Sequence, residues 1–150
     1  MKVALEEANA AYERDEVPIG AVIIDPQNGA IIARAGNRTR ELNDPTAHAE
    51  ILAIRQACES AGTQRIPGLD LYVTLEPCTM CAAAISFARI RRIIIAAPDP
   101  KGGGILHGAQ FYTQLTCHHK PEVVENVMAE QGGQILRDFF KSKRKNSVAD

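Results

Sequence analysis

Two short segments hold the residues that are best suited to chemistry. The sequence His-Ala-Glu at 48–50 stands near the expected start of a helix, and Pro-Cys-Thr-Met-Cys at 77–81 stands between a strand and a helix. A Cys-x-x-Cys pair in the first turn of a helix places both sulfurs on one face, near enough to share a metal ion. The positive end of the helix dipole favours the thiolate form that a metal requires. We therefore expect the two segments to form a metal site.

Zinc is the metal that this set of ligands favours, because it prefers sulfur together with imidazole. His48, Cys78 and Cys81 supply three protein ligands and predict one zinc ion per chain with an open fourth position, as in catalytic sites. Glu50 would then act as a base on an activated water rather than as a ligand. Residues two apart on a regular helix point about 200° away from each other. His48 and Glu50 can thus share a site only if the pocket wraps around the helix start.

Three other interpretations of these residues stay open. A redox pair of cysteines would leave the His-x-Glu sequence without a role. A structural zinc would need a fourth ligand; Cys58 is excluded because ten helical residues separate it from His48 by about 15 Å. Cys117, His118 and His119 remain candidates for that ligand. Finally, His48 could be an ordinary packed histidine.

Length and composition indicate one ordinary globular domain over residues 1–150. The chain is 45% hydrophobic and 23% charged, which is typical of a folded domain. No apolar run approaches the roughly 20 residues needed to cross a bilayer, so we expect no membrane partner. Five acidic residues among the first 16 argue against a signal peptide. Four cysteines in such a chain favour a reducing compartment, and we expect the cytoplasm.

Charge is unevenly distributed along the chain, although the net charge is only −1. Residues 1–75 carry a net charge of −4 and residues 76–150 a net charge of +3, with four of the basic residues within Lys141–Lys145. A basic tail is a weak indication of a polyanionic partner such as nucleic acid. A solvated helix end with cations near the negative end of its dipole explains the same pattern.

Apolar periodicity and turn residues predict an α/β domain with a central sheet between helices. We expect apolar core stripes on three helices: Leu5, Ala8, Ala11 and Tyr12 on the first; Ala47, Ile51, Ile54, Cys58 and Ala61 on the second; Ile135, Leu136, Phe139 and Phe140 on the last. We predict four helices: one over Met1–Asp15, one from an N-cap at Thr46 to about Gly62, one from near Cys78 to about Phe87, and one over the C-terminal stripe. The predicted strands are Ala21–Ile24, Ala30–Ala35, Asp70–Leu75, Arg92–Ala97 and Glu122–Val127. The predicted loops are Asn37–Pro45 and Pro98–Gly108.

The order His-x-Glu followed by Pro-Cys-x-x-Cys is the signature of zinc-dependent base deaminases. Longer blocks resemble the bacterial tRNA-specific adenosine deaminases, and the resemblance covers nearly the whole chain. These blocks are Asp15-Glu-Val-Pro-Ile-Gly-Ala-Val, Gly36-Asn-Arg, Asn43-Asp-Pro-Thr-Ala-His-Ala-Glu50, Leu71-Tyr-Val-Thr-Leu-Glu-Pro-Cys-Thr-Met-Cys81, Ala-Arg-Ile at 88–90, Asp99-Pro-Lys101 and Asp138-Phe-Phe140 with the basic residues after it.

The resemblance implies a fold, an activity and partners. The fold would be the three-layer α-β-α arrangement of the cytidine deaminases, with a central mixed sheet of about five strands flanked by helices. The activity would be hydrolytic deamination of the wobble adenosine in the anticodon loop of an arginine tRNA, giving inosine and ammonia. The partners would be the tRNA anticodon stem-loop and a second copy of the chain in a homodimer.

The resemblance also assigns roles to single residues. His48, Cys78 and Cys81 match the zinc ligands, and Glu50 matches the proton shuttle. Asn37 matches an amide that holds the base, which suits a purine edge with both donors and acceptors. The remaining substrate-binding positions are Ile19 as a wall of the base pocket, Asp99 and Lys101 on a loop beside the target nucleotide, and Phe140, Lys143 and Arg144 on the closing helix.

Each of these positions also has a plain structural interpretation. Asn37 could be a turn residue after a glycine, Ile19 a core residue, and the Asp99–Lys101 segment a simple turn. Either Phe139 or Phe140 could be core.

Two rival functions follow from the same motifs. A deaminase of a free base or nucleoside would use the same zinc chemistry, without a basic tail or an RNA-facing loop. A zinc-stabilised RNA-binding module would need a fourth protein ligand and would leave Glu50 without a role.

Overall fold

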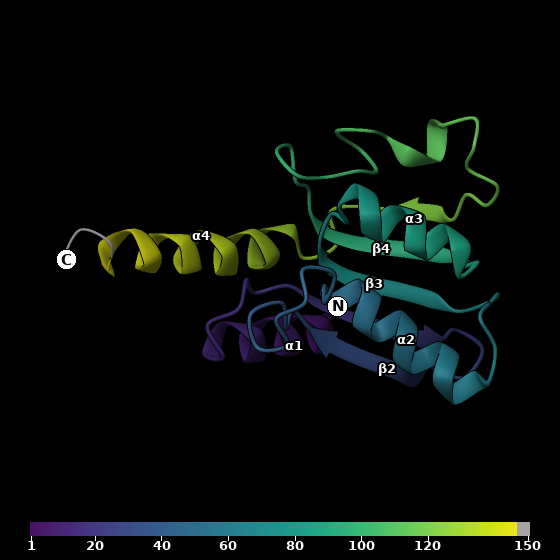
Figure 1. The fold of residues 1–150 in the computed structure, drawn as a ribbon, viewed down its shortest axis with the longest axis horizontal. Helices are drawn as coiled ribbons and strands as arrows, with labels where there is room; N and C mark the ends of the chain where they lie inside the picture. Colours follow the sequence, from purple (N-terminus) through teal and green to yellow (C-terminus); the bar gives the residue numbers. More distant parts are fainter. Residues whose placement is uncertain (147–150) are drawn as a thin grey trace.

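Five strands form one mixed sheet in the computed structural model, which describes residues 1–146 (Figure 1). The strand order is β2-β1-β3-β4-β5. The first pair, β1 (Gly20–Asp25) and β2 (Ala30–Gly36), is antiparallel, and β1 is also antiparallel to β3 (Asp70–Leu75). The strands β4 (Arg92–Ala97) and β5 (Glu122–Val124) continue parallel to β3. The mixed five-stranded sheet expected from the sequence is thus confirmed.

Four α-helices cover the two faces of this sheet. On one face lie α2 (Ala49–Ala61) and α3 (Thr79–Phe87), and on the other lie α1 (Lys2–Glu13) and α4 (Ala129–Asn146). The three-layer α-β-α arrangement is confirmed. Figure 1 shows the C-terminal part of α4 reaching well past the ends of the strands. A short 3₁₀ turn, η1 (Phe111–Thr113), lies near α3. None of the helices within residues 1–146 is long and apolar enough to cross a bilayer.

The core is built from branched side chains of the central strands. Leu71 and Val73 on β3 and Ile93 and Ile95 on β4 are completely buried, as expected for strands that helices cover on both faces. The first helix lies unusually close to β1: a Cβ at Gly20 would come within 1.9 Å of the Ala4 carbonyl oxygen. Only glycine therefore permits this approach.

The predicted start of the second helix is wrong. Its N-cap is His48, in an extended conformation, and not Thr46. The backbone is not yet helical after Thr46, because the His48 N–H donates to the Thr46 carbonyl at 2.7 Å and His48 itself is extended. The side chain of Asn37 takes the capping role from a distance: its Oδ1 accepts the N–H of Ala49 at 2.8 Å.

The predicted core face of the second helix is also displaced. The fully buried helical residues are small ones, including Ala49, Ala53 and Ala57. Alanines let the helix lie directly on the sheet, and larger side chains then lie along its sides. Of the predicted stripe, Ala47 is buried but precedes the helix, Ile51, Ile54 and Cys58 are half-buried, and Ala61 is exposed.

The last strand is shorter than predicted, ending at Val124 rather than Val127. Asn126 and Met128 have φ angles of 64° and 61°, and these left-handed residues turn the chain towards α4. One further bond joins the sheet, from the Val127 N–H to the Ile95 carbonyl.

Candidate active site

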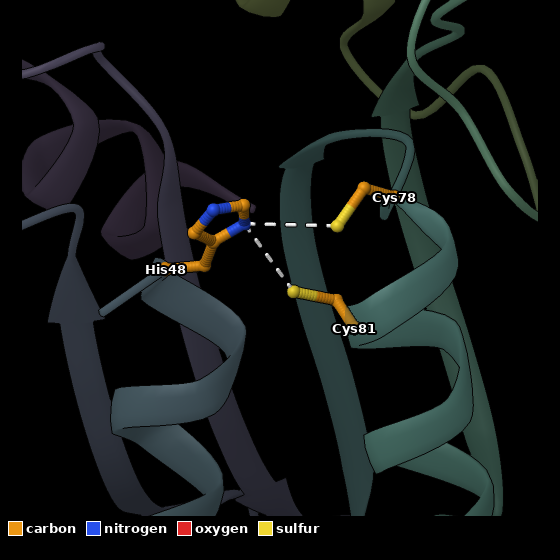
Figure 2. A group of neighbouring side chains, drawn as sticks. All are labelled: His48, Cys78 and Cys81. Atoms are coloured by element: carbon orange, nitrogen blue, oxygen red, sulfur yellow. Dashed lines mark hydrogen bonds between the residues drawn. The ribbon is translucent and has the colours of Figure 1, made fainter. Parts of the chain in front are cut away.

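Three potential metal ligands meet where α2 and α3 begin, side by side at one end of the sheet. His48 is the N-cap of α2, Cys78 is the N-cap of α3, and Cys81 follows in the first turn of α3. The Nδ1 atom of His48 lies 3.7 Å from Cys78 Sγ and 3.5 Å from Cys81 Sγ (Figure 2). All three ligand atoms lie within 4.8 Å of one another.

These distances fit a zinc ion. Tetrahedral zinc with Zn–S bonds of about 2.3 Å and Zn–N bonds of about 2.0–2.1 Å requires N···S separations of about 3.6 Å. The observed values of 3.5 and 3.7 Å lie on either side of this figure. In the described part of the chain, no fourth His, Cys, Asp or Glu joins the group. Three protein ligands with one open position are the arrangement of a catalytic zinc site.

The candidates for a fourth ligand have other partners. The Cys117 thiol donates to the His119 carbonyl at 3.2 Å and lies 3.7 Å from Ser86 Oγ. The ring of His119 contacts the Ile90 carbonyl through Nε2, at 2.6 Å, and His118 is exposed. This geometry favours the three-ligand site over a closed structural one.

The extended backbone of His48 explains how it shares a site with Glu50. With φ −72° and ψ 152°, His48 lies outside the helix. The 100° rotation per residue of a regular helix therefore does not separate the two side chains. The sequence left this point unresolved, and the N-cap position of His48 resolves it.

Glu50 is a buried carboxyl group with an unsatisfied oxygen. It is only 3% exposed, and its Oε2 is the one buried side-chain nitrogen or oxygen within residues 1–146 that has no hydrogen-bond partner. Burial raises the pKa of Glu50 to about 7. A general acid–base group works best with a pKa near the working pH, and an unsatisfied buried carboxyl group is typical of a functional site.

The two thiols share a single negative charge. The pKa of Cys78 is lowered to about 4, mainly by the hydrogen bond from the Cys81 thiol and then by His48. The pKa of Cys81 is raised, because it faces the Cys78 thiolate and is buried. A metal ion that binds both sulfurs must displace the remaining proton, so its affinity decreases as the pH falls.

Six of the seven predicted substrate-binding residues line two cavities that share Lys101 and Phe140, whereas Asn37 lines neither of them. Ile19, Asp99, Lys101 and Phe140 line a cavity of about 540 Å³ whose lining is otherwise mainly apolar. Lys101, Phe140, Lys143 and Arg144 line the second, of about 600 Å³. Three distant parts of the sequence are thereby brought to one surface.

Several of these side chains have a second, structural role. Asp99 Oδ1 accepts the N–H groups of Lys101 and Gly102 at 3.1 and 3.0 Å, which shapes a turn. Asn37 is buried, and its Oδ1 accepts the N–H of Ala49 on α2. Its NH₂ group is therefore the part of the amide that can form a hydrogen bond with a base. Lys143 forms an ion pair with Asp15.

The two neighbouring phenylalanines of α4 divide their roles. Phe139 is 5% exposed and packs edge-on against Tyr12, with ring centroids 5.5 Å apart, whereas Phe140 is 46% exposed. Phe139 is therefore the core residue, and Phe140 is the ring available to a ligand.

One buried charge near the site was missed by the sequence analysis. Glu76 lies between the end of β3 and Cys78, and its side chain is completely buried. The available signal was its position: a charged residue directly after a strand that is buried on both faces has little access to water. Its partners come from residues 99–107, far along the chain.

Comparisons with known proteins show which proteins the chain is similar to. The family model of the MafB19-like deaminases matches residues 1–144. A relative from Agrobacterium fabrum, named tRNA-specific adenosine deaminase, is 62% identical over 144 residues, which span 96% of this chain and 93% of the relative.

Two solved structures are similar to the chain. One comes from a study of A-to-I editing by tRNA deaminases at the wobble position of transfer RNA; it is 62% identical, has a TM-score of 0.88, and the match covers 91% of this chain and 97% of that one. The other, a guanine deaminase from Nitrosomonas europaea, has a TM-score of 0.80 at 23% identity over 92% of this chain and 81% of that one. At this identity the second match supports the shared fold alone.

Proposed function

This chain belongs to the family of bacterial tRNA-specific adenosine deaminases, and on that premise we propose that it deaminates the wobble adenosine of an arginine tRNA. The reaction is a hydrolysis that yields inosine in the anticodon loop and releases ammonia. The observation that carries this proposal is the cluster of His48, Cys78 and Cys81 with the unsatisfied Oε2 of the Glu50 carboxyl group beside it.

His48, Cys78 and Cys81 would hold one zinc ion per chain. Zinc supplies Lewis acidity, which makes water a nucleophile near neutral pH. The fit of the N···S distances and the absence of a fourth ligand within residues 1–146 support this assignment.

Glu50 moves the protons of the reaction. As the water oxygen bonds to C6 of adenine, the Glu50 carboxylate takes a proton from the water and delivers it to N1. The second proton of the water passes by the same route to the amino nitrogen as the C6–N6 bond breaks, and the amine leaves as ammonia. The oxygen stays on C6, which gives inosine.

The surface around the two cavities would hold the RNA. The exposed ring of Phe140 can stack on a splayed base, while Lys101, Lys143 and Arg144 can meet phosphates. Asn37 and Ile19 would contact the target base itself. A hairpin loop suits this site because its bases are already unpaired, so that moving one into the pocket costs less than in a duplex.

The same proposal includes a homodimer. It also places the protein in the cytoplasm, where its tRNA substrate is found. The side chains of Phe87 on α3 and Leu115 after η1 are exposed, and each is a large apolar group that contact with a second copy would cover. Size determination in solution tests the dimer directly.

One assay decides between this activity and its closest rival. The zinc-loaded protein is incubated separately with transcribed arginine tRNA, its anticodon stem-loop, adenosine, cytidine and guanine. We expect inosine at the wobble position of both RNAs, and much slower turnover of the small molecules. Faster conversion of free guanine or cytidine than of RNA would overturn the substrate assignment, and binding of RNA without any product would favour a non-catalytic module.

A further inference from the structure

The carboxylate of Glu76 has no place in the proposed chemistry, although it lies two residues before Cys78. It directly follows β3, and its side chain has no exposure to solvent. An ionised carboxylate in such a place is costly unless hydrogen bonds compensate for the lost water. The donors around it therefore indicate its role.

Five donor groups surround this carboxylate, and all come from residues 99–107. Oε1 accepts the consecutive backbone N–H groups of Ile105, Leu106 and His107 at 3.3, 2.8 and 3.0 Å. Oε2 accepts the N–H of Asp99 at 2.9 Å and lies 2.8 Å from His107 Nδ1. Successive N–H groups aimed at one point form an anion-binding concavity. Here the anion is part of the protein.

The hydrogen bonds keep Glu76 ionised. Burial by itself raises the pKa of this carboxyl group, but the N–H of Asp99 and the ring and backbone of His107 outweigh that effect and bring the pKa below its usual value. Because both of its oxygens accept backbone N–H groups, Glu76 acts as a fixed acceptor.

The segment 99–107 is folded tightly around the carboxylate. A Cβ at Gly103 would lie 2.3 Å from Glu76 Oε1, and a Cβ at Gly104 would lie 2.5 Å from the Thr79 nitrogen. The N–H of Gly104 also donates to the Pro77 carbonyl at 2.8 Å. The segment is thus pressed against both the end of β3 and the start of α3.

We propose that Glu76 is a positioning residue that holds segment 99–107 in the shape in which Asp99 and Lys101 face the substrate. Its carboxylate joins the N–H of Asp99 at one end of the segment to the three N–H groups at the other end, so the segment is closed into a loop. Lys101 lies at the turn between these ends, beside both cavities. The consequence for RNA rests on the proposed function.

Glutamine has the shape of glutamate but cannot replace it here. Both oxygens of Glu76 accept backbone N–H groups, so the NH₂ group of a glutamine would face a donor in either orientation. Loss of a hydrogen bond to a charged group costs about 1.5–3 kcal/mol, which corresponds to about a tenfold change or more in an equilibrium.

The same strand offers a matched control. Asp70 begins β3, its side chain is 4% exposed, and it pairs with Arg91 through two bonds of 2.8 and 2.7 Å. Six residues of extended chain place it about 20 Å from Glu76. Asp70→Asn thus removes a buried, hydrogen-bonded carboxylate from β3 without touching segment 99–107.

The test compares zinc-loaded Glu76→Gln, Asp70→Asn and the unmodified protein in three measurements: backbone amide exchange of residues 99–107, zinc content, and kinetics on the anticodon stem-loop. For Glu76→Gln we expect exchange at least about tenfold faster in this segment, about one zinc per chain, a KM raised about tenfold and a kcat within about threefold. Asp70→Asn should leave exchange in the segment and the KM unchanged.

Three results would overturn the proposal: unchanged exchange in residues 99–107 of Glu76→Gln, an unchanged KM, or the same changes in Asp70→Asn. If Glu76→Gln fails to fold, the variant His107→Ala is measured in its place. This variant removes one of the five donors to Glu76 and leaves four. It should raise both exchange in the segment and the KM about threefold, and no change in either overturns the proposal. If the unmodified protein does not act on RNA, the proposed function fails, and amide exchange alone decides whether Glu76 holds the segment.

Discussion

Glu50 and Glu76 are both buried, and each lies two residues from a proposed zinc ligand, yet their surroundings are opposite. Oε2 of Glu50 has no hydrogen-bond partner, whereas both oxygens of Glu76 accept backbone N–H groups. Burial raises the pKa of Glu50 to about 7, and hydrogen bonds lower the pKa of Glu76 despite its burial. The same residue type at the same depth is thus prepared for proton transfer in one case and for holding a loop in the other.

The two carboxyl groups therefore affect the stability of the fold in opposite ways. A buried carboxyl oxygen without a hydrogen-bond partner destabilises the fold, and such an oxygen persists where function requires it. A fully bonded carboxylate contributes to the fold, and its removal leaves several donors without a partner.

The largest effect concerns the metal on which the role of Glu50 depends. The double variant Cys78→Ser/Cys81→Ser should retain no stoichiometric zinc and form no measurable inosine, because it loses both sulfur ligands. Elemental analysis checks the first result. The control Cys58→Ser/Cys117→Ser changes two free thiols outside the cluster and should keep about one zinc per chain. Full zinc in the first variant would show that the ligands are elsewhere.

Next is the stability of the two glutamine variants, measured as the free energy of unfolding of the zinc-loaded proteins in urea. Glu76→Gln should lose about 1–3 kcal/mol because it leaves buried donors unsatisfied. Glu50→Gln should lose nothing or gain slightly, since a neutral amide is less costly to bury than an unpaired carboxyl group. Equal losses in the two variants would remove the contrast between these residues.

An effect of similar size is expected at Gly103, which lies against the same carboxylate. A methyl group there would lie 2.3 Å from Glu76 Oε1, so Gly103→Ala should displace the segment and cost about 1–3 kcal/mol, with a higher KM for stem-loop RNA. Gly29→Ala is the control. Gly29 has a φ of 72° in open space, and its replacement should lower stability without changing the KM. A normal KM for Gly103→Ala would contradict the role given to the segment.

The smallest effect concerns electrostatic contact with RNA. Lys101 is exposed and lies beside both cavities, and each lost phosphate contact lowers the salt dependence of single-stranded RNA binding by about 0.7 log units per log unit of salt. Lys101→Ala should show a reduction of this size in a titration of stem-loop RNA at several salt concentrations. Lys120→Ala, which changes an exposed lysine outside these cavities, should not. Identical slopes in both variants would place the RNA elsewhere.

The sequence predicted those parts of the molecule that depend on local patterns. The apolar runs gave the five strands within a few residues, and motif spacing selected three residues whose ligand atoms do lie together. The start of α2 was less predictable: the N-cap is the extended His48 rather than Thr46, and Asn37, 12 residues away, accepts the first helical N–H, from Ala49. The surroundings of Glu76 could not be predicted, since its partners lie 23 to 31 residues away along an irregular loop.

The rate of inosine formation per bound zinc in Glu50→Gln tests most directly whether Glu50 carries the protons of the reaction. If the Glu50 carboxyl group carries the protons, this variant should keep about one zinc per chain and its fold, and its turnover of the anticodon stem-loop should fall by about 10²–10⁴-fold. Turnover per zinc equal to that of the unmodified protein, or a loss of zinc in step with activity, would contradict the central claim that Glu50 is the proton carrier of this site.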